Sequence, residues 1–283
     1  MLTINLFNGL VHGALLIVVC SGLALIYGLR RVINFAHGSL YMLGAYIGYT
    51  VAQISDFWVA LLVVPIIMFG LGILLDRYVF RPLQDRSPLT PILVTFALLL
   101  IIEDAVQTIW GKANYSLDIP QKLQFSVSLA DTALPAYRIL IIFVGLTVAL
   151  CLTLWLQYSK IGLYVRAAST DPVATATQGI NTDILSAGVV GLGTALAGLA
   201  GVVAAPFMSL SPTMSSDVII DSFLVVVIGG LGSLGGTFAA ALLLGMVQAI
   251  GAVYLPDAAV LLPFTLMIVV LIWKPSGIAG SRT

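Results

Sequence analysis

Charged side chains are scarce in this sequence. Asp, Glu, Lys and Arg make up 8% of the 283 residues, whereas 60% are hydrophobic; soluble domains carry about 25% charged residues. Acidic and basic residues balance to a formal net charge of zero, and no basic tract suggests a nucleic-acid partner. This composition excludes an ordinary soluble domain and indicates an integral membrane protein surrounded by lipid.

Cysteine and histidine are also scarce, with two residues of each. Cys20 and Cys151 both lie within apolar runs, so we expect them to pack against neighbours and not to form a disulfide or a metal site. His12 and His37 have no partner at metal-ligand spacing, which favours packing or hydrogen-bonding roles. We therefore expect no metal to be bound.

Sequence motifs for soluble catalysis are missing as well. The chain has four lysines, and none completes a phosphate-binding G-x-x-x-x-G-K-[ST] loop. No Ser/His/Asp or Cys/His constellation indicates a soluble active site. We expect that the chain is not an enzyme and that it binds no cofactor itself.

Long apolar segments fill most of the chain, and about eight of them approach or exceed the length needed to span a bilayer. They lie at approximately Gly9–Leu29, Ile33–Ile54, Phe57–Leu75, Pro88–Trp110, Ile139–Leu156, Ile184–Met208, Asp217–Ala252 and Ala258–Trp273. No basic segment precedes the first one and no clear cleavage site follows it, so we expect it to remain as an anchor. The sequence predicts an all-α, polytopic membrane protein in which residues 1–283 form one transmembrane domain.

Basic residues orient these spans. They follow the first, third and fifth spans and are absent after the second. The residues are Arg30, Arg31, Arg77, Arg81, Arg86, Lys160 and Arg166. Because positively charged loops stay in the cytoplasm, the N-terminus is predicted outside and residues 158–183 inside. The C-terminus is left open, since eight simple crossings put it outside whereas Lys274 and Arg282 favour the inside.

The segment from Tyr158 to Asp183 is a polar island between apolar spans. Asp171 and Pro172 are typical of an N-cap and a first helical residue, and Gly179 is typical of a left-handed helix stop. A helix from Pro172 to about Gln178 is only about 10 Å long, too short to span a bilayer. It is either a lever on which a soluble partner pushes or an ordinary connecting loop.

Two apolar runs are broken by small or polar residues. The run from Leu23 is broken around Asn34 and His37, and the run from Val225 is broken by glycines. These are Gly229, Gly230, Gly232, Gly235 and Gly236. Paired breaks often mark the solute pathway of a transporter, because non-helical backbone at membrane depth needs protein or a watery cavity to satisfy it. We expect a discontinuous or re-entrant helix within Asp217–Ala252. A surface hairpin or close helix packing on small residues is the alternative.

Few charged residues fall near mid-membrane, and Glu103 and Asp104 are the main candidates. An ionised carboxylate at that depth is costly unless it faces a wet cavity or a partner. The pair forms either a proton or cation site or the end of a helix near the outer interface, where Trp110 and Lys112 follow. We favour the interface, because a tilted or shifted helix brings both carboxylates to the headgroups.

Six runs of the sequence resemble the permeases of high-affinity branched-chain amino-acid ABC transporters. They are LALIYGLRRVINFAHGSLYMLGAYI from Leu23, YVFRPLQDRSPLTPILVT from Tyr78, SKIGLYVRAASTDPVATATQGIN from Ser159, ALAGLAGVVAAP from Ala195, IGGLGSLGGTFAAALLLG from Ile228, and the closing WKPSGI. They cover nearly the whole chain in the family's order, and they resemble in particular the shorter of the two permease subunits.

This resemblance implies a path for branched-chain or other hydrophobic amino acids across the bacterial inner membrane. It also implies four kinds of partner: membrane lipid, a second permease, two cytoplasmic ATPase subunits that bind the ATP, and a periplasmic solute-binding protein. Similar permeases serve urea, short amides and aromatic acids, so the solute stays open. An ion-coupled secondary transporter or a channel is the alternative class.

The resemblance also implies roles for particular residues. The family's cytoplasmic coupling segment falls on Gly162, Arg166, Ala167, Asp171, Pro172, Ala174, Gly179, Ile180 and Asn181. Its N-F-A-H-G signature falls on residues 34–38, at the first break. The expected translocation path comprises Asn34, His37, Gly38, Gly229, Gly230, Gly232, Gly235 and Gly236. One departure is that the family's fourth span more often carries amides where this sequence has Glu103 and Asp104.

Overall fold

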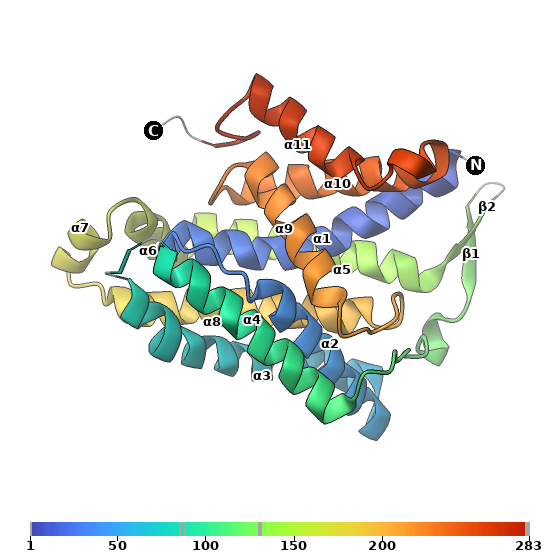
Figure 1. The fold of residues 1–283 in the computed structure, drawn as a ribbon, viewed down its shortest axis with the longest axis horizontal. Coiled ribbons are helices and arrows are strands. Elements are labelled where there is room, and N and C mark those ends of the chain that lie inside the picture. Colours follow the sequence, from blue (N-terminus) through green and yellow to red (C-terminus); the bar gives the residue numbers. More distant parts are fainter. Residues whose placement is uncertain (1, 85, 88, 130–131, 281–283) are drawn as a thin grey trace.

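The computed structural model describes residues 2–84, 86–87, 89–129 and 132–280, and it is predominantly helical (Figure 1). The α-helices are α1 (Leu2–Arg30), α2 (His37–Ile54), α3 (Phe57–Leu75), α4 (Leu89–Trp110), α5 (Ala136–Tyr158), α6 (Lys160–Thr170), α7 (Pro172–Thr177), α8 (Thr182–Ala204), α9 (Met214–Gly229), α10 (Leu234–Tyr254) and α11 (Leu262–Trp273). Shorter helical turns are η1 (Asp76–Phe80), η2 (Arg81–Leu83), η3 (Gln121–Leu123) and η4 (Pro256–Ala258). Strands β1 (Ser126–Leu129) and β2 (Thr132–Pro135) pair antiparallel, with Ser126 opposite Pro135.

The prediction of an all-α membrane protein is confirmed. In the part of the chain that the structure describes, six helical segments are long and apolar enough to cross a membrane. They are Thr3–Arg30, Phe57–Leu83, Leu89–Trp110, Ala136–Tyr158, Thr182–Ala204 and Leu234–Tyr254. The other apolar helices, α2, α9 and α11, contain 18, 16 and 12 residues. About eight spans were expected; α2 has the minimum length of a span, whereas α9 and α11 are shorter.

The basic residues that orient the chain gather at one end of the molecule. Arg30, at the end of α1, pairs with Asp76 in the turn after α3, and Arg81 pairs with Asp183 at the start of α8. Helices α6 and α7 lie at this end, while the N-terminus and the β1–β2 hairpin lie at the opposite end (Figure 1). Because positively charged loops face the cytoplasm, we call the end with α6 and α7 the cytoplasmic end.

The break predicted within Asp217–Ala252 separates two complete helices, α9 and α10. Gly230 and Gly232 form the turn between them with φ values of +101° and +82°. L-residues with side chains rarely adopt such angles, so glycine is needed at these two positions. The predicted discontinuity is confirmed, and the segment contributes two helices joined by a tight turn where the sequence count assumed one.

Because α9 and α10 are separate helices, the described part of the chain ends on the cytoplasmic side. The amides of Ile278 and Ala279 donate to the carbonyls of Ile228 and Gly229, at 2.8 and 3.0 Å. These carbonyls end α9 at the cytoplasmic end. The tail after α11 therefore lies at the cytoplasmic end, as Lys274 suggested and in contrast to the outside position given by eight simple crossings.

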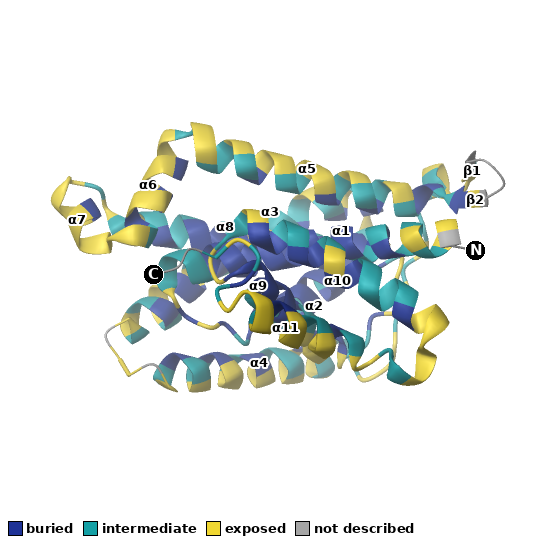
Figure 2. Ribbon diagram, turned by 90° about the horizontal axis from the view of Figure 1, so that it is seen from above, coloured by how far each residue is buried: buried dark blue, intermediate teal, exposed yellow. Residues whose placement is uncertain are grey.

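Helix α1 forms the centre of the bundle. It is buried along most of its length and packs between α8 and α10 (Figure 2). Gly245 of α10 has no room for a Cβ because Gly9 and Gly13 of α1 contact it through their backbones. Close approach on small residues is the usual way in which membrane helices associate. Lipid tails are as apolar as the side chains, so the hydrophobic effect does not drive the helices together.

The outward faces of α3, α4 and α5 carry large exposed apolar side chains. Leu62, Leu93 and Phe143 are examples, exposed by 71, 68 and 66%. Such surfaces suit contact with lipid tails or with another membrane subunit. Cys20 is buried in α1, whereas Cys151 is exposed on α5, and within the described chain both are unpaired.

Candidate functional site

Helices α6 and α7 project from the cytoplasmic end of the bundle (Figure 2). The Ser159 hydroxyl caps α6 by accepting from the Gly162 amide at 2.8 Å. The Asp171 carboxylate caps α7 by accepting from the Ala174 amide at 2.9 Å. Gly179 follows α7 with φ of +82°. The predicted short helix with an Asp171 cap and a Gly179 stop is confirmed.

Most of the residues assigned to coupling are exposed, and two of them, Gly162 and Asn181, support the local fold. Gly162 is buried where a Cβ would meet the carbonyls of Trp155 and Leu156. Asn181 caps α8, because its Oδ1 accepts from the amides of Asp183 and Ile184 at 3.1 and 3.0 Å. The exposed members are Arg166, Ala167, Asp171, Pro172, Ala174, Gly179 and Asn181, and Ile180 is half-buried. The exposed set is available to a partner at the cytoplasmic end, and its coupling role stays a prediction.

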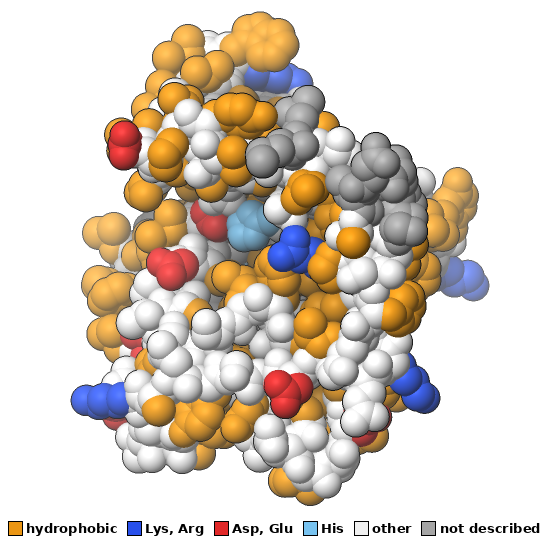
Figure 3. Space-filling view, turned by 90° about the vertical axis from the view of Figure 1, so that its right-hand side faces the viewer, with side chains coloured by type: hydrophobic (Ala, Val, Ile, Leu, Met, Phe, Trp, Pro, Cys, Tyr) orange, Lys and Arg blue, Asp and Glu red, His pale blue; other side chains and the backbone are white. Residues whose placement is uncertain are grey.

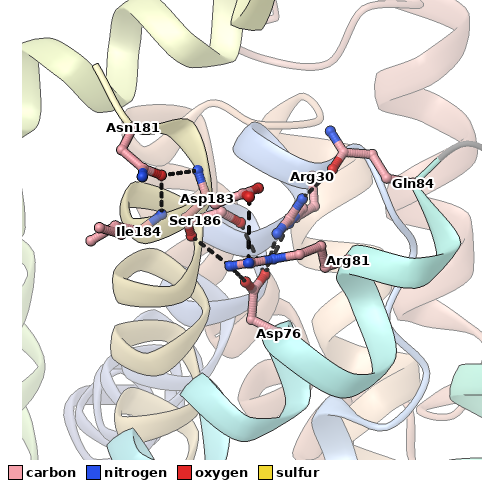
Figure 4. Close-up of polar contacts among 8 residues, drawn as sticks. All are labelled: Arg30, Asp76, Arg81, Gln84, Asn181, Asp183, Ile184 and Ser186. Carbon is pink, nitrogen blue, oxygen red and sulfur yellow. Dashed lines mark hydrogen bonds and ion pairs between the residues drawn. The ribbon is translucent and has the colours of Figure 1, made fainter. Parts of the chain in front are cut away.

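A charged network ties this end of the bundle together (Figure 4). Asp76 accepts from Nε and Nη2 of Arg30 at 2.9 and 2.7 Å, and from the Ser186 hydroxyl at 3.0 Å. The Arg81 guanidinium lies 3.6 Å from Asp76 and 3.4 Å from Asp183. The network therefore joins the end of α1, the turn after α3 and the first turns of α8.

Because this network is buried, its ion pair contributes to the stability of the fold. The Arg30 side chain is 5% exposed and that of Asp76 is fully buried. Removing one partner of a buried ion pair typically costs about 3–5 kcal/mol, because the other charge is left without compensation. The relative positions of α1, α3 and α8 are thus held by charge as well as by packing.

The sequence analysis used Arg30 and Arg81 only to orient the spans, and it missed Asp76. A signal was present, because Asp76 is a carboxylate directly after an apolar helix of 19 residues. Arg77 and Arg81 follow it within two helical turns. A carboxylate at the end of an apolar span, with arginines close to it in the chain, indicates a specific partner.

The first predicted break descends into the bundle. Residues 31–36 are non-helical, and α2 begins at His37, whose Nε2 lies 2.8 Å from the Val19 carbonyl of α1. Val19 lies about 16 Å before the end of α1, at about 1.5 Å per residue. Helix α2 therefore starts at membrane depth, as expected for a broken helix.

Polar groups at the first break satisfy backbone, which non-helical chain inside a membrane requires because no water is there to bond to it. The fully buried Asn34 accepts from the Ala36 amide through Oδ1 at 3.1 Å, and the fully buried His37 bonds to Val19. Gly38 has no room for a Cβ because the Ser215 carbonyl of α9 contacts it. These contacts support the break, and direct contact of Asn34, His37 or Gly38 with solute stays a prediction.

Helices α4 and α9 meet beside the first break. The ring of Phe35 lies 5.0 Å from that of Phe223 on α9 and 6.4 Å from that of Phe96 on α4. Glu103 of α4 is half-buried and accepts a hydrogen bond from the Ser215 hydroxyl of α9. Its neighbour Asp104 is exposed. Glu103 thus has a partner inside the bundle, while Asp104 faces outward.

Four of the five glycines at the second break pack against backbone. Gly229 and Gly236 contact each other across the turn, Gly230 contacts Gly280 of the tail, and Gly232 lies beside Gly28 of α1. At Gly235 an added Cβ would have no described atom within 4 Å. Close packing on small residues, the alternative raised from the sequence, describes the first four, and their role in the path stays a prediction.

Comparison with known proteins gives the family. Residues 5–271 match the model of the family described as "Branched-chain amino acid transport system / permease component". The chain belongs to this family. The match covers the bundle, the cytoplasmic helices and both breaks.

Curated relatives align along almost their whole length. The permease protein BraD of a high-affinity branched-chain amino acid transport system in Pseudomonas aeruginosa is 30% identical, with 98% of this chain and 95% of BraD covered. The corresponding LivH of Salmonella typhimurium is 28% identical, with 98 and 94% covered. A probable LivH permease of Methanocaldococcus jannaschii is 26% identical, with 96 and 91% covered.

A solved structure shares the fold. PsaBC from Streptococcus pneumoniae in complex with Fab superposes with a TM-score of 0.51 over 95% of this chain and 91% of that chain, at 13% identity. The resemblance to the shorter permease type is confirmed by the family and the full-length relatives. The protein is a multi-pass inner-membrane permease that acts with other components of a transport system, and a permease of this kind is not itself an enzyme.

Proposed function

We propose that this permease carries branched-chain or other hydrophobic amino acids in an ABC importer and that α6 and α7 dock on a cytoplasmic ATPase subunit. The observation that carries the docking is the projecting, doubly capped pair of helices at the arginine-rich end. The ATP is bound by two such subunits, and this chain holds no cofactor. A second permease and a periplasmic solute-binding protein complete the assembly.

The surface of α7 suits a protein partner. Val173 is 74% exposed on a short polar helix outside the spans. Thr175, by contrast, is buried, and its hydroxyl donates to the Asp171 carbonyl at 2.8 Å. A rigid helix that presents an apolar side chain to water is the usual form in which a helix enters a groove of another protein.

Contacts at the cytoplasmic end connect α6 and α7 to the membrane spans. The turn after α7 leads into α8, whose Asp183 and Ser186 belong to the network around Asp76. Arg31 also donates to the Ser169 carbonyl of α6 at 3.2 Å, which links α6 to the end of α1. A push on α7 would therefore reach α1, α3 and α8 together. Family membership supports this ABC mechanism over an ion-coupled transporter or a channel.

The test is made on the assembled transporter in proteoliposomes, with solute-binding protein and ATP supplied. Val173→Glu should reduce co-purification of the ATPase subunits and leucine uptake by about tenfold or more, because a buried charge is costly at an interface. Val173→Thr keeps the shape and should retain most of both. Ile54→Glu, a matched change at an exposed apolar residue of the opposite end, should leave co-purification unchanged.

Two outcomes would contradict the proposal. Normal ATPase binding by Val173→Glu would remove α7 from the docking surface. Uptake of urea, short amides or aromatic acids in place of leucine by the unsubstituted transporter would replace the proposed solute.

A further inference from the structure

Helices α9 and α10 and the segment from η4 to α11 line an open cavity of about 410 Å³. Four of its lining residues, Asp217, Ile220, Asp221 and Leu224, recur at the spacing that places side chains on one face of a helix. Phe264 lines it from α11. One face of α9 thus presents carboxylates and aliphatic side chains alternately to the same space.

The polar groups of this cavity have unused acceptor capacity. Gln248 of α10 donates through Nε2 to Asp221 Oδ1 at 3.0 Å, and its own Oε1 is buried without a hydrogen-bond partner in the described chain. His12 of α1 lies 3.8 Å from the other Asp221 oxygen, beyond hydrogen-bonding distance. Asp217 is exposed to the cavity, and no hydrogen bond or ion pair within the described residues occupies its carboxylate.

The acceptors of this cavity match a ligand with a cationic hydrogen-bond donor. Carboxylates inside a membrane protein are costly unless they pair or line a functional cavity. A primary ammonium group carries three donors and one positive charge, which matches the two carboxylates and the open oxygen of Gln248. The aliphatic and aromatic walls suit an apolar side chain, and the volume lies within the range of about 300–1,000 Å³ typical of small-molecule sites.

The cavity also lies where an incoming solute would arrive. Gln248 is about 9 Å from the end of α10, at about 1.5 Å per residue, on the side opposite α7. Figure 3 views this end of the molecule, where acidic and histidine side chains lie in a hollow among apolar ones, with a basic side chain beside the histidine. The hollow opens toward the side on which the solute-binding protein is proposed to dock.

We infer that this cavity is an entry subsite that binds the ammonium group of a hydrophobic amino acid through Asp217 and Asp221. The inference rests on the proposed function and extends it from a class of solute to the residues that recognise it. Solutes with the apolar side chain but no ammonium group are excluded, because they would leave the Asp217 carboxylate without a donor and would add no counter-charge for Asp221.

The test is made on the transporter purified with its permease and ATPase partners but without the solute-binding protein. Equilibrium binding of radiolabelled leucine is measured, with isoamylamine, which lacks the carboxylate, and isocaproate, which lacks the ammonium group, as competitors. We expect isoamylamine to displace leucine and isocaproate to leave it bound. Asp221→Asn and Asp217→Asn should each weaken leucine binding by about tenfold or more, because each loses a charge-assisted hydrogen bond.

The matched control is Asp257→Asn. Asp257 is an exposed acidic residue of η4, beside the cavity but not among its lining residues. We expect it to bind leucine as the unsubstituted complex does. The subsite is overturned if the unsubstituted complex binds no leucine, if both cavity variants bind it normally, if isocaproate competes as well as isoamylamine, or if Asp257→Asn weakens binding equally.

Failure of this inference can be told apart from failure of the proposed function. The same preparations, reconstituted in vesicles with solute-binding protein and ATP, are assayed for leucine uptake. Uptake by the unsubstituted transporter, together with any of the overturning binding results, rejects the subsite alone. Absence of uptake by the unsubstituted transporter rejects the proposed solute as well.

Discussion

Arg30 Nη2 lies 2.7 Å from Asp76 Oδ1 at a place from which water is almost excluded, and this pair joins the end of α1 to the turn after α3. The pair also faces the first turns of α8 through Ser186 and Arg81. Because α8 continues directly from the segment after α7, the stability of this contact bears on coupling as well as on folding.

Replacing Asp76 is expected to destabilise the protein severely. Asp76→Asn leaves Arg30 and Arg81 without a counter-charge, and we expect a loss of about 3–5 kcal/mol in the free energy of unfolding. Asp183→Asn is the matched control, since the Asp183 side chain is 52% exposed and exposed pairs contribute about 0–1 kcal/mol. Thermal unfolding of the detergent-purified protein measures both, and equal unfolding temperatures would show that the buried pair contributes little.

The cap of α7 can be removed without touching the bundle. Asp171→Ala should destabilise α7 locally by about 0.5–2 kcal/mol and lower solute-stimulated ATPase activity, while membrane insertion is unchanged. Asp171→Asn keeps an N-cap acceptor and should retain most of the activity. Stimulated ATPase activity of the reconstituted transporter distinguishes them, and full activity of the alanine variant would argue against a lever.

Substitution of Gly179 is expected to impair coupling as much as loss of the Asp171 cap. Its φ of +82° strains any residue with a β-branched side chain, so Gly179→Val should misdirect the chain between α7 and α8. Solute-stimulated ATPase activity should fall while the yield of membrane-inserted protein is retained. If Gly179→Val transports normally, the stop of α7 does not matter for coupling.

His37 is expected to act through its hydrogen bond and not through titration. His37→Gln retains a donor for the Val19 carbonyl and should keep most leucine uptake. His37→Leu loses the bond and should lower the free energy of unfolding by about 0.5–1.5 kcal/mol. Uptake and thermal unfolding are measured together, and abolished uptake in a stable glutamine variant would indicate a role for protonation.

The glycines of the second break should differ sharply in tolerance. Gly236→Ala forces a Cβ against the Gly229 carbonyl and should destabilise the α9–α10 turn by about 1–3 kcal/mol. Gly235→Ala meets no described atom within 4 Å and is the matched control. Yield and unfolding temperature of the two variants test this, and equal stability would mean that the turn is not closely packed.

The sequence predicted the class of fold because the length and spacing of apolar runs are set by the bilayer. It also predicted the breaks at Asn34 and around Gly230, the residues that begin and end α7, and the cytoplasmic position of α7. Each of these depends on residues near one another in the chain. The separation of α9 from α10 was only partly predicted, since a glycine-rich turn and a kinked helix have similar sequences.

Pairings between distant helices could not be read from the sequence. Asp76 meets Arg30 and Ser186 only because α1, α3 and α8 are neighbours, and no local pattern specifies that arrangement. The same holds for Asp221, which was counted within an apolar span, and for its neighbours His12 and Gln248. The β1–β2 hairpin was also not predicted.

The late start of α2 changes the cross-section of the bundle. At the depth of residues 31–36, a single irregular chain and the rings of Phe35, Phe96 and Phe223 stand where a helix about 10 Å wide would otherwise lie. A ring changes rotamer without breaking a backbone hydrogen bond, whereas a helix must repack along its length to move. At this level the packing between α4, α9 and the chain before α2 can therefore change by side-chain rotation alone.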